Sequence, residues 1–219
     1  MRLSILSKFR EPVNGLIHLC GAIIAFFGLI ALLIFGWNGA MRIVSVSIYG
    51  LSLIAMFSTS AAYHLAKVEP AVLLTLRKLD HSAIFLLIAG TYTPFCMIAF
   101  TGFWRWGLLA IIWTIAAVGI VIKVFYLKAP RWVNVVIYVV MGWLCVMAAP
   151  KMLYVLPVDT MIWLIIGGVV YTLGAVVYVT KIFDFVPQKF GFHEIWHVFV
   201  LIGASAHYVS VMSLLVSLA

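Results

Sequence analysis

Residues 13–36 read VNGLIHLCGAIIAFFGLIALLIFG, a run that holds no Asp, Glu, Lys or Arg. A helix needs about 20 apolar residues to cross the hydrocarbon core of a bilayer, so this run is long enough to cross it alone. The run is also too long for the hydrophobic region of a signal peptide, and no small-residue cleavage site follows it. We therefore interpret it as a first, retained transmembrane helix.

Six further apolar segments of similar length follow along the chain. None of them shows the alternation over about ten residues that is typical of a membrane β-strand. The sequence therefore predicts a single all-α membrane domain over residues 1–219, built as a bundle of seven transmembrane helices. The expected spans lie near residues 13–36, 43–65, 81–100, 106–124, 132–149, 162–180 and 195–218.

The composition of the chain indicates the same fold class. Of the 219 residues, 66% are hydrophobic and 9% are charged, whereas soluble domains are about 45–50% apolar and about 25% charged. This composition excludes a soluble enzyme and a nucleic-acid-binding module. The formal net charge of +8 instead predicts basic cytoplasmic loops and contact with anionic lipid.

The basic residues are divided unevenly between the two sides of the predicted bundle. With the N-terminus inside, three of the 14 Lys and Arg residues fall in outer segments, namely Arg42, Arg105 and Lys151, and all the others fall in inner segments. Cytoplasmic loops of membrane proteins carry the excess of Lys and Arg. We therefore expect a multi-pass protein of the inner (plasma) membrane, with its N-terminus in the cytoplasm and its C-terminus outside.

Polar residues recur where spans two, three and seven meet the cytoplasmic side. Because successive helices alternate in direction, the end of span two and the starts of spans three and seven lie at the same depth. His64 ends span two, Asp80 opens span three, and His193 and His197 open span seven. Charged and imidazole side chains are costly in hydrocarbon, so each of these residues needs a partner or a function.

The spacing of these residues is typical of a metal site. His193 and His197 are four residues apart and share one face of a helix. Together with His64, they could give zinc three imidazole ligands and leave a fourth position open for water, as in catalytic zinc sites. In this interpretation Asp80 is the general base, and Ser60, one turn before His64, is an auxiliary hydrogen-bond donor.

Other interpretations of the polar residues stay open. A single membrane histidine is often a packing residue. Residues 193–197 read HEIWH, which matches the HExxH motif of zinc proteases, but the metzincin pattern needs a further histidine where this chain has Gly203. In span one, Glu11, Asn14 and His18 share a face. They would support the metal ligands from behind, line a proton or substrate path, or form hydrogen bonds between helices.

The ordered set of motifs resembles the hemolysin III family, the bacterial branch of the progestin and adiponectin receptor (PAQR) superfamily. The resemblance covers nearly the whole chain, and the order of the motifs is more specific than any one of them. The matching strings are EPVNGLIH (11–18), SAAYH (60–64), LDH (79–81), AGTYTP (89–94), MGW (141–143), HEIWH (193–197) and AHY (206–208).

The resemblance implies seven helices, a cytoplasmic N-terminus and a zinc ion near the cytoplasmic face. It places the family's Ser-x-x-x-His on Ser60 and His64, its Asp on Asp80, and its His-x-x-x-His on His193 and His197. By analogy with adiponectin receptors and alkaline ceramidases, it suggests hydrolysis of a lipid amide or ester, with a membrane lipid as substrate. The alternative is a non-enzymatic membrane protein with a structural zinc, either a haemolysin-like pore or channel or a regulator of membrane homeostasis.

Overall fold

The protein is all-helical in the computed structural model, which describes residues 8–126, 129–186 and 190–217. Within these ranges the only β-type pairing is an isolated bridge between Val186 and Phe190. The helices are α2 (Pro12–Gly36), α3 (Ala40–Leu65), α4 (Pro70–Pro94), α5 (Gly102–Phe125), α6 (Arg131–Trp143), α7 (Ala149–Val155), α8 (Val158–Thr180) and α9 (Phe192–Ser217), with a π-helical turn η1 (Phe95–Ala99) and a 3₁₀ turn η2 (Leu144–Ala148).

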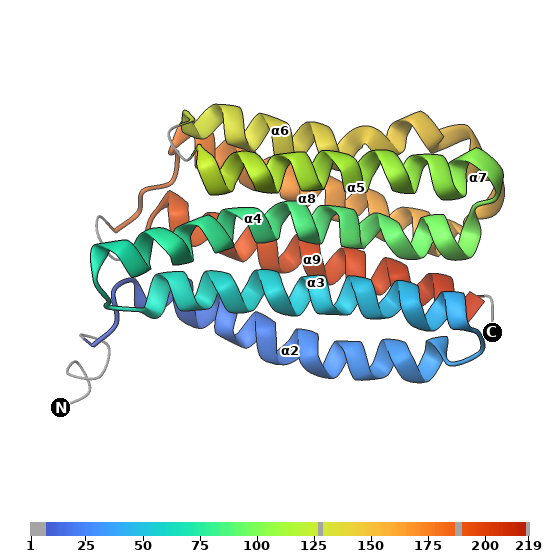
Figure 1. Cartoon of the computed structure of the whole chain (residues 1–219), viewed down its shortest axis with the longest axis horizontal. Helices are drawn as coiled ribbons and strands as arrows, with labels where there is room; N and C mark the ends of the chain where they lie inside the picture. Colours follow the sequence, from blue (N-terminus) through green and yellow to red (C-terminus); the bar gives the residue numbers. More distant parts are fainter. Residues whose placement is uncertain (1–7, 127–128, 187–189, 218–219) are drawn as a thin grey trace.

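Seven helical segments of the described chain are long and apolar enough to cross a membrane. One of them joins α4 to η1, and another joins α6, η2 and α7. The segments run along the long axis of the molecule, and the two chain ends lie at opposite ends of the bundle (Figure 1). We call the end at which α2 begins the N-terminal end, and the other the far end. The predicted all-α fold and the number of spans are confirmed.

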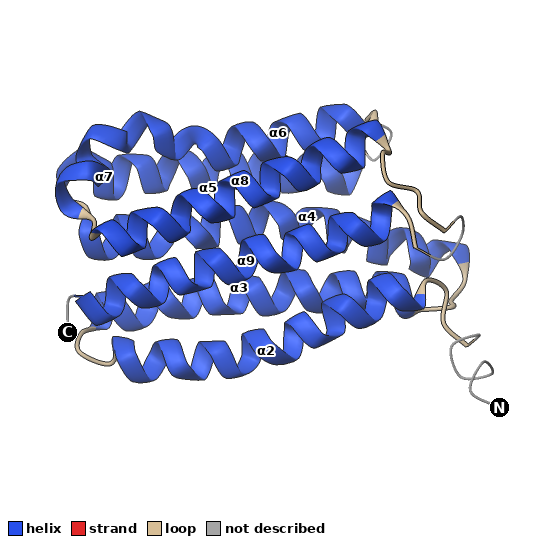
Figure 2. Cartoon of the chain, turned by 180° about the vertical axis from the view of Figure 1, so that it is seen from behind, coloured by secondary structure: helices blue, strands red, loops and turns tan. Residues whose placement is uncertain are grey.

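Helices from the two halves of the chain are brought together by the way in which the bundle closes. α2 packs against α3, α3 against α4, and α4 against α5. On the other side, α6 packs against α8 and α8 against α9. α9 then packs against α2, so that the first and last helices lie side by side (Figure 2). The end of α3 and the start of α9 consequently share the N-terminal end of the bundle.

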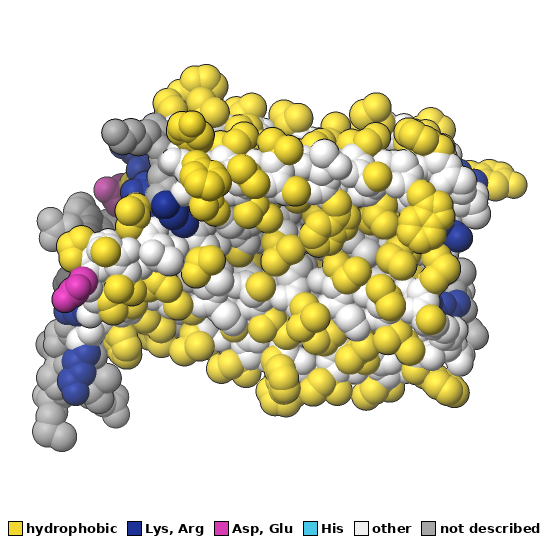
Figure 3. Space-filling model, in the orientation of Figure 1, with side chains coloured by type: hydrophobic (Ala, Val, Ile, Leu, Met, Phe, Trp, Pro, Cys, Tyr) yellow, Lys and Arg dark blue, Asp and Glu magenta, His cyan; other side chains and the backbone are white. Residues whose placement is uncertain are grey.

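The outer surface of the bundle is apolar along the length of its helices. Large hydrophobic side chains such as Phe27, Ile34 and Leu51 are exposed. On the face seen in Figure 3, hydrophobic side chains cover the body of the bundle and charged ones gather toward its ends. This distribution matches a protein whose middle is surrounded by lipid hydrocarbon.

Helix α4 corrects the predicted start of the third span. The sequence places that start near residue 81, but α4 begins at Pro70, where the missing N–H of proline costs no helical hydrogen bond. The charges of Arg77 and Lys78 suggest a loop when only hydropathy is considered, yet both residues are helical. Our prediction that Asp80 opens the helix is therefore wrong. Asp80 lies about three turns inside α4.

Two irregular turns interrupt the spans. After Pro94, which has no N–H to donate and whose ring crowds the preceding turn, α4 widens into the π-helical turn η1. The fifth span narrows into the 3₁₀ turn η2 between α6 and α7. There the Tyr92 hydroxyl donates to the Gly142 carbonyl (2.7 Å) and accepts from the Cys145 N–H (2.8 Å). This hydroxyl supplies hydrogen bonds that an interrupted helix lacks.

Candidate metal centre

Three histidines from α3 and α9 meet at the N-terminal end of the bundle. His64 lies in the last turn of α3, and His193 and His197 lie one turn apart at the start of α9. Each offers one ring nitrogen, and these atoms lie within 4.8 Å of one another. The ring centroids of His64 and His197 are 4.6 Å apart, and those of His193 and His197 are 4.9 Å apart. This histidine cluster could hold a metal ion.

The surroundings of the histidine cluster fit a bound cation. His64 and His197 are 2% and 3% exposed. The Nε2 atom of His197 is buried and has no hydrogen-bond partner among the described residues. A buried polar atom without a partner is costly, and coordination to a metal ion would satisfy it. Imidazole nitrogens suit zinc but also copper, iron and nickel, so the donor set indicates a transition metal without naming it.

Two of the three imidazoles form hydrogen bonds with side chains at the start of α2. The Nδ1 atom of His64 donates to Oε2 of Glu11 at 2.6 Å. The Nδ1 atom of His197 lies 2.9 Å from Nε2 of His18. Metal-ligating histidines usually form such a hydrogen bond with their second nitrogen, because it fixes the ring orientation. The structure thus brings both Glu11 and His18 into contact with the histidine cluster.

The Glu11 carboxylate is ionised at neutral pH. Partial burial alone would raise the pKa of Glu11, but the hydrogen bond and charge interaction with His64 and the guanidinium of Arg10 outweigh burial and lower this pKa to about 2. One Glu11 oxygen lies 3.3 Å from the Arg10 guanidinium. A carboxylate accepts but does not donate, so His64 directs its Nδ1–H to Glu11 and keeps Nε2 available for an ion.

Asn14 links the start of α2 to the start of α9. Its side chain is 1% exposed, and its Nδ2 donates to Oε1 of Glu194 at 3.0 Å and to Oε2 of Glu11 at 3.4 Å. The other Glu194 oxygen accepts the Gly191 N–H at 2.8 Å, as in a capping box. The HExxH motif predicts Glu194 only as the base of a zinc protease, whereas here its carboxylate caps α9. The three-residue spacing from Gly191 was the signal for its role as a helix cap.

Asp80 and Ser60 line the same cavity as the three histidines. Oδ2 of Asp80 lies 3.4 Å from Nδ1 of His81, whose ring also bonds to the Arg77 carbonyl at 2.9 Å. Ser60 Oγ is buried and makes no direct hydrogen bond to a described residue, although it lies close enough to Asp80 for electrostatic interaction. Neither residue is in the histidine cluster, so both are available to a substrate or to water.

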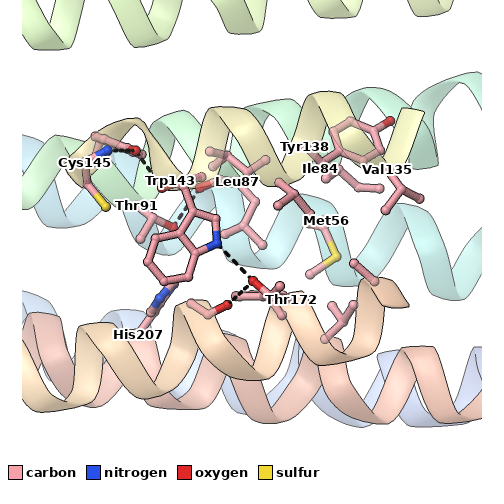
Figure 4. A pocket seen from close by; sticks show the side chains of 18 of the residues that line it. Met56, Ile84, Leu87, Thr91, Val135, Tyr138, Trp143, Cys145, Thr172 and His207 are labelled. Atoms are coloured by element: carbon pink, nitrogen blue, oxygen red, sulfur yellow. Dashed lines mark hydrogen bonds between the residues drawn. The ribbon is translucent and has the colours of Figure 1, made fainter. Parts of the chain in front are cut away.

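A cavity of about 810 Å³ extends from the histidine cluster into the bundle. Figure 4 shows part of its wall, in which the side chain of Trp143 reaches Thr172. The polar groups of this part bond to one another or to the backbone: Trp143 Nε1 donates to Thr172 Oγ1 (2.9 Å), and the Thr91 hydroxyl donates to the Leu87 carbonyl (2.8 Å). The deeper cavity therefore suits a hydrocarbon chain better than a polar ligand.

His207 lies apart from the histidine cluster. It is on α9, about 15 Å beyond His197 along the helix axis. Its Nε2 donates to the Leu164 carbonyl at 3.2 Å, and its ring packs so closely on Gly167 that a Cβ there would collide with it. The contacts of His207 are therefore those of a residue that joins two helices.

These features define a class of protein: an all-helical, multi-pass membrane protein with three histidines gathered at one end of the bundle. The family model described as "Haemolysin-III related" matches residues 6–208. The chain belongs to this family, and the resemblance seen in its motifs is confirmed.

Curated relatives extend the similarity along the chain. "Hemolysin-3" of Bacillus cereus is 36% identical over 206 residues, which cover 93% of this chain and 90% of that protein. "Hemolysin-3 homolog" of Bacillus subtilis (strain 168) is 35% identical over 205 residues and 93% of each chain. "Monocyte to macrophage differentiation factor" of Homo sapiens is 28% identical over 176 residues, or 77% of this chain and 69% of that protein.

Proposed function

We propose that this protein is a zinc-dependent membrane hydrolase that cleaves an amide or ester bond of a lipid. The observation that carries the proposal is the convergence of His64, His193 and His197 at one end of a largely apolar cavity. Three protein ligands with a fourth position open is the pattern of catalytic zinc sites. Zinc–nitrogen bonds are about 2.0–2.1 Å long, so modest rotations of the rings would close the cluster on one ion.

The residues around the histidine cluster would divide the work of hydrolysis. Zinc, when bound, would supply the Lewis acidity that lowers the pKa of water and polarises a carbonyl. The Asp80 carboxylate would accept the proton of the attacking water and deliver it to the leaving amine or alcohol. The Ser60 hydroxyl would donate a hydrogen bond to the carbonyl oxygen. One water is consumed, and a fatty acid and an amine or alcohol are released.

Glu11 and His18 would act as positioning residues rather than as participants in the reaction. Their hydrogen bonds to His64 and His197 restrain two ligand rings before the ion arrives. The deeper cavity would take the acyl chain and exclude water from it. The lipid would then present its carbonyl group at the only part of the described cavity wall where imidazoles cluster.

We also propose that the N-terminal end of the bundle faces the cytoplasm. The support is the excess of Lys and Arg in the segments at this end of the sequence-predicted topology, because cytoplasmic loops carry such an excess. The substrate would then enter the cavity sideways from the inner leaflet of the plasma membrane.

The metal content and lipid turnover of purified protein test this proposal. The wild type is expected to hold about one zinc per chain and to release fatty acid from ceramide or phospholipid. The variants His64→Ala and His197→Ala are expected to lose both properties. His207→Ala is the matched control, because His207 lines the cavity from the same helix as His197 but lies outside the histidine cluster.

Two results would contradict the proposal in different ways. Full zinc occupancy in both His64→Ala and His197→Ala would show that the histidine cluster is not the zinc site. Stoichiometric zinc in the wild type without turnover of any lipid amide or ester would favour the alternative, a non-enzymatic membrane protein with a structural zinc. Ion flux in liposomes that survives both variants would favour a pore or channel.

A further inference from the structure

Basic side chains gather beside the histidine cluster at the mouth of the cavity. Arg77 of α4 and Arg131 of α6 both line the cavity that contains His193. Arg77 lies one turn before Asp80 and His81 and therefore on the same face of α4. Both residues are exposed, so two different helices bring guanidinium groups to a part of the cavity wall that solvent reaches.

Arg131 is held against aromatic rings rather than against a carboxylate. Its guanidinium lies over the Tyr178 ring at 4.9 Å and near the Phe192 ring at 5.3 Å. Tyr178 also lies next to the candidate metal centre, because the centroid of its ring is 5.7 Å from that of His193. Cation–π contact orients a guanidinium and leaves its N–H donors for a ligand.

A third cation lies behind these two. Lys123 of α5 is 2% exposed, and its Nζ donates to Oδ1 of Asn134, which also lines the cavity. Asn134 thus connects the Lys123 ammonium group to the wall of the cavity that Arg77 and Arg131 also line.

The described residues place no carboxylate within ion-pair distance of these cations. The carboxylates of Glu11 and Asp80 pair with other residues, in the contacts Arg10–Glu11, His64–Glu11 and His81–Asp80. Arg77 and Arg131 are exposed, so their N–H donors are accessible to an anionic ligand. Guanidinium groups bind phosphate through paired, charge-assisted hydrogen bonds.

We infer that Arg77 and Arg131, backed by Lys123, form a phosphate-binding site at the mouth of the cavity, and that its ligand is the phosphate headgroup of a membrane phospholipid. A headgroup held by these residues lies beside the metal centre, while the cavity receives the attached chain. This inference narrows the substrate of the proposed hydrolase to phosphate-bearing lipids, and that narrowing rests on the proposed function. The binding of a phospholipid headgroup by Arg77 and Arg131 does not depend on the proposed function.

Native mass spectrometry of the purified full-length protein measures the binding. The probes are phosphatidylglycerol and a diacylglycerol with the same acyl chains, so that they differ only in the phosphate headgroup. The wild type is expected to prefer phosphatidylglycerol by at least about tenfold, as two charge-assisted contacts allow. The double variant R77Q/R131Q is expected to lose this preference and to bind diacylglycerol as the wild type does.

The matched control is K8Q/K78Q. It removes the same number of positive charges from the same end of the bundle, and Lys78 is the neighbour of Arg77 on α4, yet neither lysine lines the cavity. This control is expected to keep the preference within about twofold, since neither lysine lines the cavity and charges in contact with solvent are screened. If R77Q/R131Q does not fold, the single variants R77Q and R131Q are each expected to reduce the preference by about threefold or more.

Three outcomes would overturn the inference. They are a wild type that does not distinguish the two lipids, a double variant that keeps the preference, and a control that loses it equally. Inorganic phosphate that binds as tightly as phosphatidylglycerol would overturn the assignment to a lipid headgroup. His64→Ala, which removes a proposed zinc ligand, is expected to lose turnover but keep the preference, so failure of the hydrolase and failure of the phosphate site are distinguishable.

Discussion

The two ends of the bundle use buried polar side chains in different ways. At the far end, Ser210 Oγ donates to the Thr160 carbonyl (2.6 Å) and the Thr160 hydroxyl donates to Ser213 Oγ (3.1 Å). These hydrogen bonds join α8 to α9, which is how small polar residues hold membrane helices together. At the N-terminal end, His197 Nε2 and Ser60 Oγ are buried without such partners. The comparison teaches that the polar groups of α8 and α9 at the far end serve packing, whereas His197 and Ser60, which line the cavity, are available to a ligand.

Removing a ligand histidine is expected to have the largest effect. His197→Ala leaves two imidazoles for the ion, and we expect zinc to be lost and turnover to fall by at least about 10³-fold, because both the Lewis acid and its bound water go with it. Metal analysis and a fatty-acid release assay measure the two quantities. His207→Ala should keep the wild-type zinc content, because His207 lies outside the histidine cluster. An equal loss of zinc in both variants would contradict the distinction between the ligand histidines and the packing histidine.

Asp80→Asn is expected to separate chemistry from metal binding. Asp80 lies outside the histidine cluster, so zinc content should stay at the wild-type level. Turnover should fall by about 10²–10⁴-fold, the usual contribution of a general base. The measurement is initial rate at saturating lipid alongside zinc content. A variant that keeps its rate would exclude Asp80 as the base, and one that loses zinc would instead make it a ligand.

Glu11→Gln is expected to have an intermediate effect. It keeps the shape of the side chain but replaces the carboxylate that accepts from His64 at 2.6 Å. Loss of such a supporting hydrogen bond typically lowers metal affinity by about 10–100-fold, which competition with a zinc chelator measures. Glu69→Gln, at the exposed start of α4, is the control and should leave the affinity unchanged. An unchanged affinity in Glu11→Gln would show that Glu11 serves only to join helices.

Ser210→Ala probes the far end and is expected to have the smallest effect. It deletes the donor to the Thr160 carbonyl, which should lower the free energy of unfolding by about 1 kcal/mol, as for a typical buried hydrogen bond. Zinc affinity and turnover should not change. Thermal unfolding in detergent measures the first quantity. A loss of zinc in this variant would show that the two ends are coupled and not independent.

Much of the fold could be predicted from the sequence, because hydropathy alone locates segments long enough to span a bilayer. The alternation of helix direction was sufficient to predict that His64 lies at the same end of the bundle as His193 and His197, although these residues are far apart in the sequence. Hydropathy could not find the start of α4 at Pro70, since a helix can continue past the hydrocarbon and carry Arg77 and Lys78 with it. It also could not find the 3₁₀ turn η2, whose hydrogen bonds depend on Tyr92, a residue of another helix.

The surroundings of the histidine cluster were harder to predict than its members. Helical spacing grouped Glu11, Asn14 and His18 on one face but could not identify their partners, because these lie on α3 and α9. The HExxH pattern drew attention to Glu194 as a base, whereas its oxygens bond to Asn14 and to the Gly191 N–H. The sequence could not predict that Arg77 and Arg131 line the same cavity, since they come from helices whose relative placement is set by packing.

Anomalous diffraction at the zinc absorption edge, from crystals of the purified protein, tests the central claim most directly. We expect one strong peak per chain, bounded by His64, His193 and His197 and about 2.0–2.1 Å from a nitrogen of each. A crystal of zinc-replete protein with no peak among these three imidazoles, or with its peak elsewhere in the bundle, would contradict the claim.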